Sequence, residues 1–159
     1  MIAKLLLEAT LDTLYMTFVS TFLAFIIGLG LAIILVITNK NGLKPNKAIY
    51  NALDIIVNTL RSFPFIILII VLFPFTKFIV GTSIGTTAAI VPLTIGSAPF
   101  IARLIENAMN EVDHGIIEAA LSYGATKTQI IFKVIFIEAL PSIINAITLT
   151  LIVVIGFTA

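Results

Sequence analysis

The sequence predicts an all-α fold, a polytopic transmembrane helical bundle with about four spans, and three observations favour this class. Of its 159 residues, 60% are hydrophobic and only 11% are charged, and the mean hydropathy of +1.20 is far above that of a soluble domain. Long apolar runs alternate with short polar turns. Basic residues gather in two of those turns, as they do in cytoplasmic loops. We therefore treat residues 1–159 as a single transmembrane domain.

The first span is predicted over residues 14–37, which carry no charge and are long enough to cross a hydrocarbon core of about 30 Å. Within it Ala24, Gly28 and Ala32 recur at four-residue spacing, so they present a small-residue face to a neighbouring helix. The turn at residues 38–47 contains Asn-Gly, Pro and several lysines. Its charge predicts that this turn lies in the cytoplasm and that the N-terminus lies outside.

The second span is predicted over residues 54–80 and the third over residues 86–103. Proline interrupts both runs, at Pro64 and within Gly96-Ser97-Ala98-Pro99. Proline removes a backbone donor, which a membrane helix tolerates where neighbours satisfy the freed carbonyl. We therefore expect a kink or a helix end at Pro64, and a bend or an interruption near the second cluster.

Irregular backbone at membrane depth survives where it is buried in protein or lines a cavity. An ionisable residue within a span is also a functional hypothesis. Arg61, Pro64, Ser97 and Pro99 are therefore our candidates for a translocation path. The alternatives are ordinary packing kinks and, for Arg61, a place near the cytoplasmic edge where the side chain reaches lipid phosphates.

The longest polar interruption, residues 113–129, is expected to form a short helix followed by a turn and a new helix. Asp113 is a favourable N-cap, and Gly124 is a favourable residue just beyond a helix end. Together they delimit a helix of about three turns. Thr126 and Gln129 have the spacing of a capping box, which predicts that the next helix starts there.

A fourth span is predicted over residues 135–157, with Glu138 and Pro141 near its start, where both are favourable. Basic residues lie within the preceding polar segment, at Lys127, and on both sides of it, at Arg103 and Lys133. By the positive-inside rule, we expect this segment to lie in the cytoplasm, between the third and fourth spans.

The sequence offers no groups for catalysis. There is no cysteine and one histidine, His114, so a metal centre is not expected and this residue is interpreted as solvated. No GxxxxGKS or GxxxxGKT phosphate loop is present; residues 124–128 only resemble its end. We expect no pair of carboxylates on one membrane face. A net charge of +1 gives no support for nucleic-acid binding. We expect no enzymatic activity and no cofactor in this chain.

Glu118-Ala119-Ala120, followed after three residues by Gly124, resembles the EAA loop of the membrane subunits of ABC importers. Residues 61–108 and 138–152 are similar to the branch of that family that imports methionine. The chain departs from the family pattern at Phe136-Ile137, where Leu-Pro is usual.

The resemblance implies a permease of the bacterial cytoplasmic (inner) membrane, surrounded by lipid, that forms a homodimer. A cytoplasmic ABC ATPase would hydrolyse ATP, and an extracytoplasmic binding protein would deliver methionine, in its D or L form. The family's coupling helix sits in a groove of the ATPase, which assigns Glu118, Ala119, Ala120 and Gly124 to ATPase coupling. The family also has a fifth span, so we expect that the chain lacks a C-terminal span.

Two other functions remain open from the residues alone. A secondary transporter or a channel would work without an ATPase partner, but it would favour intramembrane acids or repeated broken helices. A membrane scaffold would not transport at all. Copurification of an ATPase would separate the importer from both.

Overall fold

The computed structural model describes residues 2–158, and every regular element within that range is a helix, which confirms the all-α prediction. In chain order the elements are α1 (Ile2–Thr38), α2 (Lys47–Ser62), α3 (Phe65–Val80), α4 (Thr86–Asn110), α5 (His114–Ser122), α6 (Lys127–Gln129), the π-helix η1 (Ile130–Ile135), α7 (Phe136–Glu138) and α8 (Leu140–Thr158).

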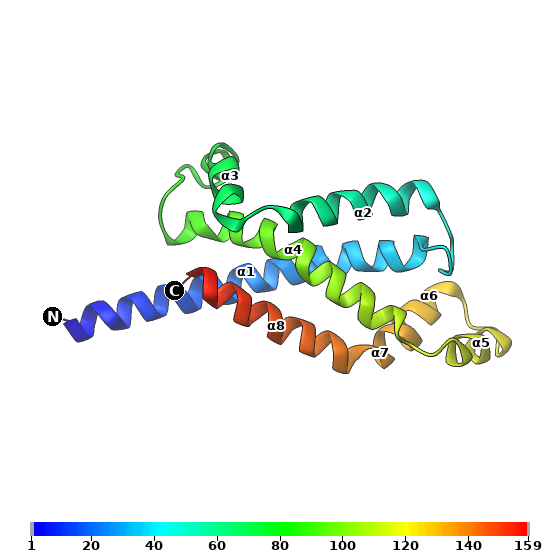
Figure 1. Cartoon of the computed structure of the whole chain (residues 1–159). Helices are drawn as coiled ribbons and strands as arrows, with labels where there is room; N and C mark the ends of the chain where they lie inside the picture. The colour runs from blue at the N-terminus through cyan, green and yellow to red at the C-terminus, as the bar shows by residue number, and fades with distance from the viewer. Residues whose placement is uncertain (1, 159) are drawn as a thin grey trace.

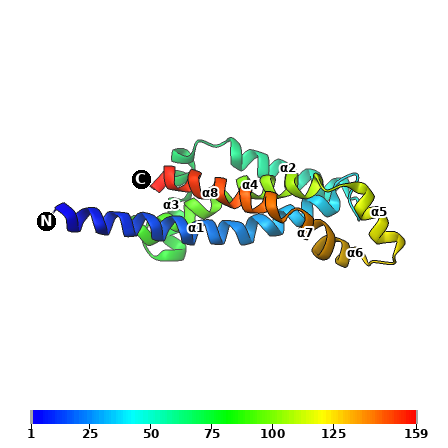
Figure 2. The same cartoon turned by 90° about the horizontal axis from the view of Figure 1, so that it is seen from below.

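The long helices form an elongated bundle around α4 (Figure 1). Helix α4 contacts α1 most extensively and also packs against α2, α3 and α8. Helix α3 runs across the direction of its neighbours, and the N-terminal part of α1 extends beyond the other helices (Figures 1 and 2). The short helices α5 and α6 lie together at the opposite end of the bundle, beside the turn between α1 and α2.

The main hydrophobic core lies towards the α5–α6 end of the bundle and joins α1, α4, η1 and α8. Its buried members include Ala32, Val36, Ile101, Ile105, Met109, Ile130, Ile135 and Ile143. Many large apolar side chains on the outer faces of α1, α3 and α8 are instead exposed in this single chain. Apolar exposure on this scale fits helices surrounded by lipid or by further protein rather than by water.

The predicted small-residue face of α1 is confirmed. Ala24 and Ala32 are 0% exposed, and Gly28 lies between them against α4. A Cβ atom on Gly28 would lie 2.2 Å from the Cγ2 atom of Ile101 and 3.0 Å from the carbonyl oxygen of Ala98. Small residues therefore allow the two longest helices to approach closely.

We expect Gly28→Leu to destabilise the bundle by roughly 1–3 kcal/mol or more, because the added atoms overlap α4. The matched control is Gly30→Leu on the same helix, since a Cβ atom there meets no atom within 4 Å. The midpoint of thermal unfolding in detergent is measured for both variants from their resistance to protease. Equal midpoints for the two variants would contradict this account of the contact between α1 and α4.

The boundaries of the predicted spans differ from the helices in several places. Helix α1 begins well before residue 14, and α4 continues beyond Arg103 to Asn110. The run predicted as one span over 54–80 is two helices, α2 and α3, bent by 111° at a short break. Three helices within residues 2–158 are long and apolar enough to cross a membrane, or four if this bent pair counts as one span. The membrane limits of each span remain predictions.

The prolines do not act alike. Pro64 is the N-cap of α3 and marks the predicted helix end. The expected interruption near Pro99 was wrong, since α4 runs without a break through Pro92 and Pro99. Both of these prolines are buried against neighbouring helices. A missing backbone donor removes one hydrogen bond, and packing on several sides allows a long helix to tolerate that loss.

The new helix predicted after residue 126 starts where expected, with a different geometry. The Thr126 hydroxyl accepts from the Gln129 amide at 3.3 Å, and the Gln129 side chain accepts from the Thr126 amide at 2.8 Å. This is the predicted capping box. After one turn the chain continues as the π-helix η1, then as α7 and α8.

Candidate functional site

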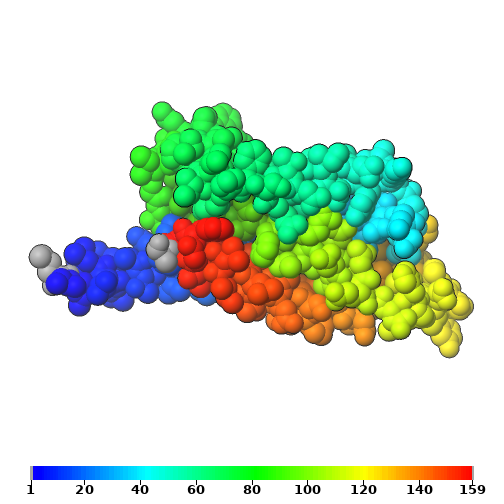
Figure 3. Space-filling view, in the orientation of Figure 1, coloured from blue at the N-terminus to red at the C-terminus, as the bar shows by residue number. Residues whose placement is uncertain are grey.

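Helix α5 is the centre of the predicted coupling loop, and it projects from the end of the bundle (Figures 1, 2 and 3). Its N-terminus is capped as predicted, because the Asp113 carboxylate accepts from the Gly115 amide at 2.6 Å. His114 is the first residue of the helix and is exposed. The Gly115 amide in the first turn of α5 therefore has its hydrogen-bond acceptor within the loop itself.

The C-terminus of α5 ends in a Schellman motif centred on Gly124. The Gly124 amide donates to the carbonyl of Leu121 at 2.9 Å, and the Ala125 amide donates to the carbonyl of Ala120 at 3.0 Å. Gly124 has φ +80°, a left-handed conformation that costs glycine little and other residues more. The predicted helix stop at Gly124 is confirmed.

One face of α5 rests on the bundle and the other is open. Ile117 and Ala120 are partly buried against the main core, whereas Glu118 and Ala119 are exposed. The turn after the helix is tied to the loop between α1 and α2, because Lys127 Nζ donates to the carbonyl of Leu43 at 2.7 Å. The exposed face of α5 is therefore presented by a helix fixed at both ends and along one side.

A second polar group joins α2 to α4, and sequence reasoning missed it. Arg103 was expected to end the third span on its basic side, but α4 continues beyond it to Asn110. The Arg103 side chain is only 15% exposed. Its guanidinium contacts Asp54 at 2.5 Å and Glu106 at 2.7 Å. The expectation that no two carboxylates share a face was therefore wrong.

Further hydrogen bonds complete this ion cluster, which we define as Tyr50, Asp54, Asn58, Arg103 and Glu106. The Tyr50 hydroxyl donates to Glu106 at 3.2 Å, and Arg103 donates to Asn58 at 3.1 Å. Glu106 is only 2% exposed, so its charge depends on these partners. One feature of the sequence could have indicated this cluster: Arg103 and Glu106 are three residues apart, which places them on one face of a helix. The cluster locks α2 against α4.

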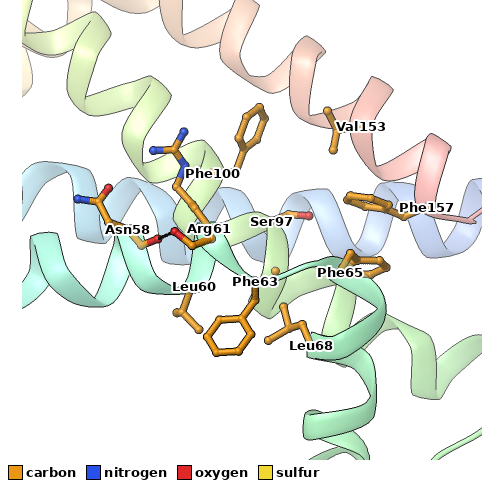
Figure 4. A pocket seen from close by; sticks show the side chains of 12 residues that line it. Asn58, Leu60, Arg61, Phe63, Phe65, Leu68, Ser97, Phe100, Val153 and Phe157 are labelled. Carbon is orange, nitrogen blue, oxygen red and sulfur yellow. Dashed lines mark hydrogen bonds between the residues drawn. The ribbon is translucent and has the colours of Figure 1, made fainter.

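A cavity of about 590 Å³ lies where the bent pair α2–α3 meets α4 and α8 (Figure 4). Its lining residues are Asn58, Leu60, Arg61, Ser62, Phe63, Phe65, Leu68, Gly96, Ser97, Phe100, Val153 and Phe157. The structure thus brings together two of the four predicted path residues, Arg61 and Ser97. Pro64 forms the adjacent helix break, whereas Pro99 is buried in α4 and is not part of the lining.

Arg61 does not lie near the end of the bundle that carries the lysine-rich turn. It is close to the end of α2, about 21 Å along the helix from Lys47. The expected position near the cytoplasmic edge was therefore wrong. The reason is that α2 starts earlier than residue 54 and places Arg61 at the helix break, beside the cavity.

These features define a class of protein: a polytopic helical membrane protein with an exposed short helix at one end and a largely apolar cavity at a helix break. Residues 24–159 match the family described as the binding-protein-dependent transport system inner membrane component. The chain belongs to this family, and it is therefore an inner-membrane component of such a system.

Two curated relatives are D-methionine transport system permease proteins named MetI. The chain is 51% identical to the one from Escherichia coli K12 over 155 residues, which is 98% of this chain and 71% of the relative. It is 53% identical to the one from Yersinia pestis over 148 residues, which is 93% of this chain and 68% of the relative.

A solved structure has the same fold. It is described as an inward-facing conformation of the MetNI methionine ABC transporter, and the TM-score is 0.96 at 50% sequence identity. The match covers 98% of this chain and 72% of that chain. The bent α2–α3 pair and the presented helix α5 belong to this shared region, since the match includes almost all of the described residues.

Proposed function

We propose that the chain is the permease subunit of an ATP-driven importer of methionine, in its D or L form. The observation that carries this proposal is the identity of about half of all residues to methionine permeases over nearly the whole chain. The family membership supports delivery of the substrate by an extracytoplasmic binding protein. Two copies of the chain would form the pathway between them.

In this proposal α5 is the coupling helix that docks on a cytoplasmic ATPase. Glu118 and Ala119 lie on its exposed face and would contact the ATPase. Ala120 supports the helix from the bundle side, and Gly124 ends it. Because both ends are capped and one side is packed, a push from the ATPase would move α5 as a rigid unit.

ATP hydrolysis would take place in the partner. The sequence contains no phosphate-binding loop of the GxxxxGKS type. Lys127, which lies within the similar stretch at residues 124–128, donates instead to the carbonyl of Leu43. The role of this chain would be to convert movement of the ATPase into movement of the helices around the cavity.

The translocation path would pass the break between α2 and α3. Arg61 and Ser97 line the cavity there, and Pro64 creates the break. Irregular backbone at membrane depth is tolerated where it lines a cavity. Pro99 would shape α4 through packing, because it is buried away from the lining.

Reconstitution tests the function. A permease that contains residues 1–159 is assembled with its ATPase subunits in proteoliposomes, and the binding protein and radiolabelled L- or D-methionine are added outside. We expect uptake that requires both ATP and the binding protein. Uptake that needs an ion gradient but no ATP would favour the secondary transporter, and ATP-driven uptake of a different amino acid alone would overturn methionine as the substrate.

A further inference from the structure

Helix α2 meets α4 through polar side chains more than through apolar ones. Of the residues of α2, Val57 alone is fully buried within the described chain, and Ile55 and Ile56 are more than half exposed. The hydrophobic effect has no preferred direction, so a helix that buries one apolar side chain can turn or slide on its neighbour. The polar contacts therefore decide where α2 lies.

These polar contacts form a row that centres on Arg103. Tyr50, Asp54 and Asn58 follow one another at four-residue spacing, which places them along one face of α2. The Arg103 guanidinium donates to Asp54 and Asn58 of that face, and it also donates to Glu106 on its own helix. Glu106 in turn accepts from the Tyr50 hydroxyl. Arg103 thus holds two side chains of α2 directly and orients the acceptor of a third.

The ion cluster fixes the position of α2 more than it adds to stability. A buried ion pair can often be replaced as a whole by uncharged side chains with little loss of stability. A planar guanidinium, however, donates in fixed directions. Acceptors on both helices therefore specify the rotation of α2 and its height along α4. Uncharged side chains would hold the two helices together without specifying that register.

Arg103 lies between α5 and the cavity. Helix α4 ends at Asn110, and α5 begins at His114. Val112 in this short connection is buried in the main core, so a displacement of α5 pulls directly on the end of α4. In the other direction Asn58, which accepts from Arg103 at 3.1 Å, is also part of the cavity lining (Figure 4). The ion cluster thus joins the helix that leads to α5 to the helix that forms a wall of the cavity.

We propose that Arg103 is a positioning residue for transport, which makes α2 follow α4 when α5 is moved. Its bonds to Asp54 and Asn58 carry that movement to the wall of the cavity. Arg103 is not itself part of the cavity lining, and it lies in α4 rather than on the exposed face of α5. This inference rests on the proposed function and adds to it the connection between the ATPase contact and the path.

The test measures methionine uptake and ATP hydrolysis in the same proteoliposomes, with a permease that contains residues 1–159, its ATPase subunits and the binding protein. The variant combines Arg103→Gln with Asp54→Asn and Glu106→Gln, so that no buried charge is left without a partner. We expect ATP hydrolysis near that of the unmodified complex, and uptake per ATP hydrolysed that is lower by about fivefold or more. A purely structural role would lower uptake and hydrolysis together and leave their ratio unchanged.

A control and a rescue separate the role of Arg103 from a general effect of lost charges. Lys4→Gln with Glu8→Gln removes an exposed ion pair near the N-terminus of α1 and should change neither rate. For the rescue, Asp54→Cys, Arg103→Cys and Glu106→Gln are combined. Residues 1–159 contain no other cysteine, so bifunctional methanethiosulfonate reagents of graded length can join α2 to α4 in a complex with cysteine-free partners. The link, verified by mass spectrometry, should restore uptake per ATP, and reduction should abolish it again.

Three results would overturn the inference: an unchanged ratio of uptake to hydrolysis in the uncharged variant, a parallel fall of both rates, or a lowered ratio that no link between α2 and α4 restores. Each of these can occur while the unmodified complex takes up methionine with ATP, and the proposed function would then stand. Absence of uptake by the unmodified complex would count against the proposed function itself.

Discussion

Gly124→Val is expected to abolish ATP-driven uptake and stimulation of the ATPase, while the protein still inserts into the membrane. Gly124 holds φ +80°, and a β-branched residue in that conformation costs roughly 1–2 kcal/mol. The strain is relieved by extending or shifting the end of α5. Glu118 and Ala119 would then meet the ATPase in the wrong position, so coupling would fail before folding does.

The matched control is Gly81→Val. Gly81 has φ +85°, and a Cβ atom there, as at Gly124, meets nothing within 4 Å. It ends α3, away from α5. The two variants therefore carry similar backbone strain at different places. Uptake and ATPase stimulation are measured at equal membrane abundance, and Glu118→Lys should reproduce the coupling defect by reversing the docking charge.

If Gly124→Val kept wild-type uptake, the proposed role of α5 in coupling would be wrong. If both glycine variants lost uptake equally, the defect would come from strain in general, and Gly124 would have no special role in docking. Loss in Gly124→Val alone, with normal insertion of both proteins, is the result that we expect.

Arg103→Gln is expected to destabilise the protein by roughly 3–5 kcal/mol, because it leaves a buried acid without its cation. Glu106 is 2% exposed and Asp54 about one-third exposed, so Glu106 bears most of the penalty. The variant should lose protease resistance in detergent at a clearly lower temperature than the unmodified protein.

A triple variant, Arg103→Gln with Asp54→Asn and Glu106→Gln, removes all three charges, and the changes at the two acids keep the shapes of their side chains. It should recover much of the lost stability, since no buried charge is left without a partner. Equal midpoints for Arg103→Gln and the unmodified protein would contradict the view that the ion cluster holds α2 against α4.

Local patterns in the sequence predicted the local structure of residues 113–129 well. The capping of α5 by Asp113, its end at Gly124 and the capping box at Thr126 depend on residues close together in the chain, and each was confirmed. The small-residue face around Gly28 was also predictable, because four-residue spacing places side chains on one side of a helix whatever its partner is.

Long-range geometry was not predictable in the same way. Asp54 and Arg103 are 49 positions apart, and nothing local indicates that they meet. Proline marked the break at Pro64, but the same residue type at Pro99 lies in an unbroken helix. The difference depends on packing by neighbouring helices, and the order of residues around a proline does not show that packing. No pattern in the sequence indicated the π-helix η1 either.

The π-helix has a consequence for the length of the chain between the coupling loop and α8. In η1 each amide reaches back five residues, so the turn holds one residue more than an α-helical turn. Removing one residue from η1 would restore an α-helical turn and keep the direction of the side chains that follow. Removing one residue inside α8 would instead rotate everything after it by about 100° and turn Val154 away from its buried position. We therefore expect a one-residue deletion in η1 to leave the same face of α8 buried, and a one-residue deletion in α8 to expose it.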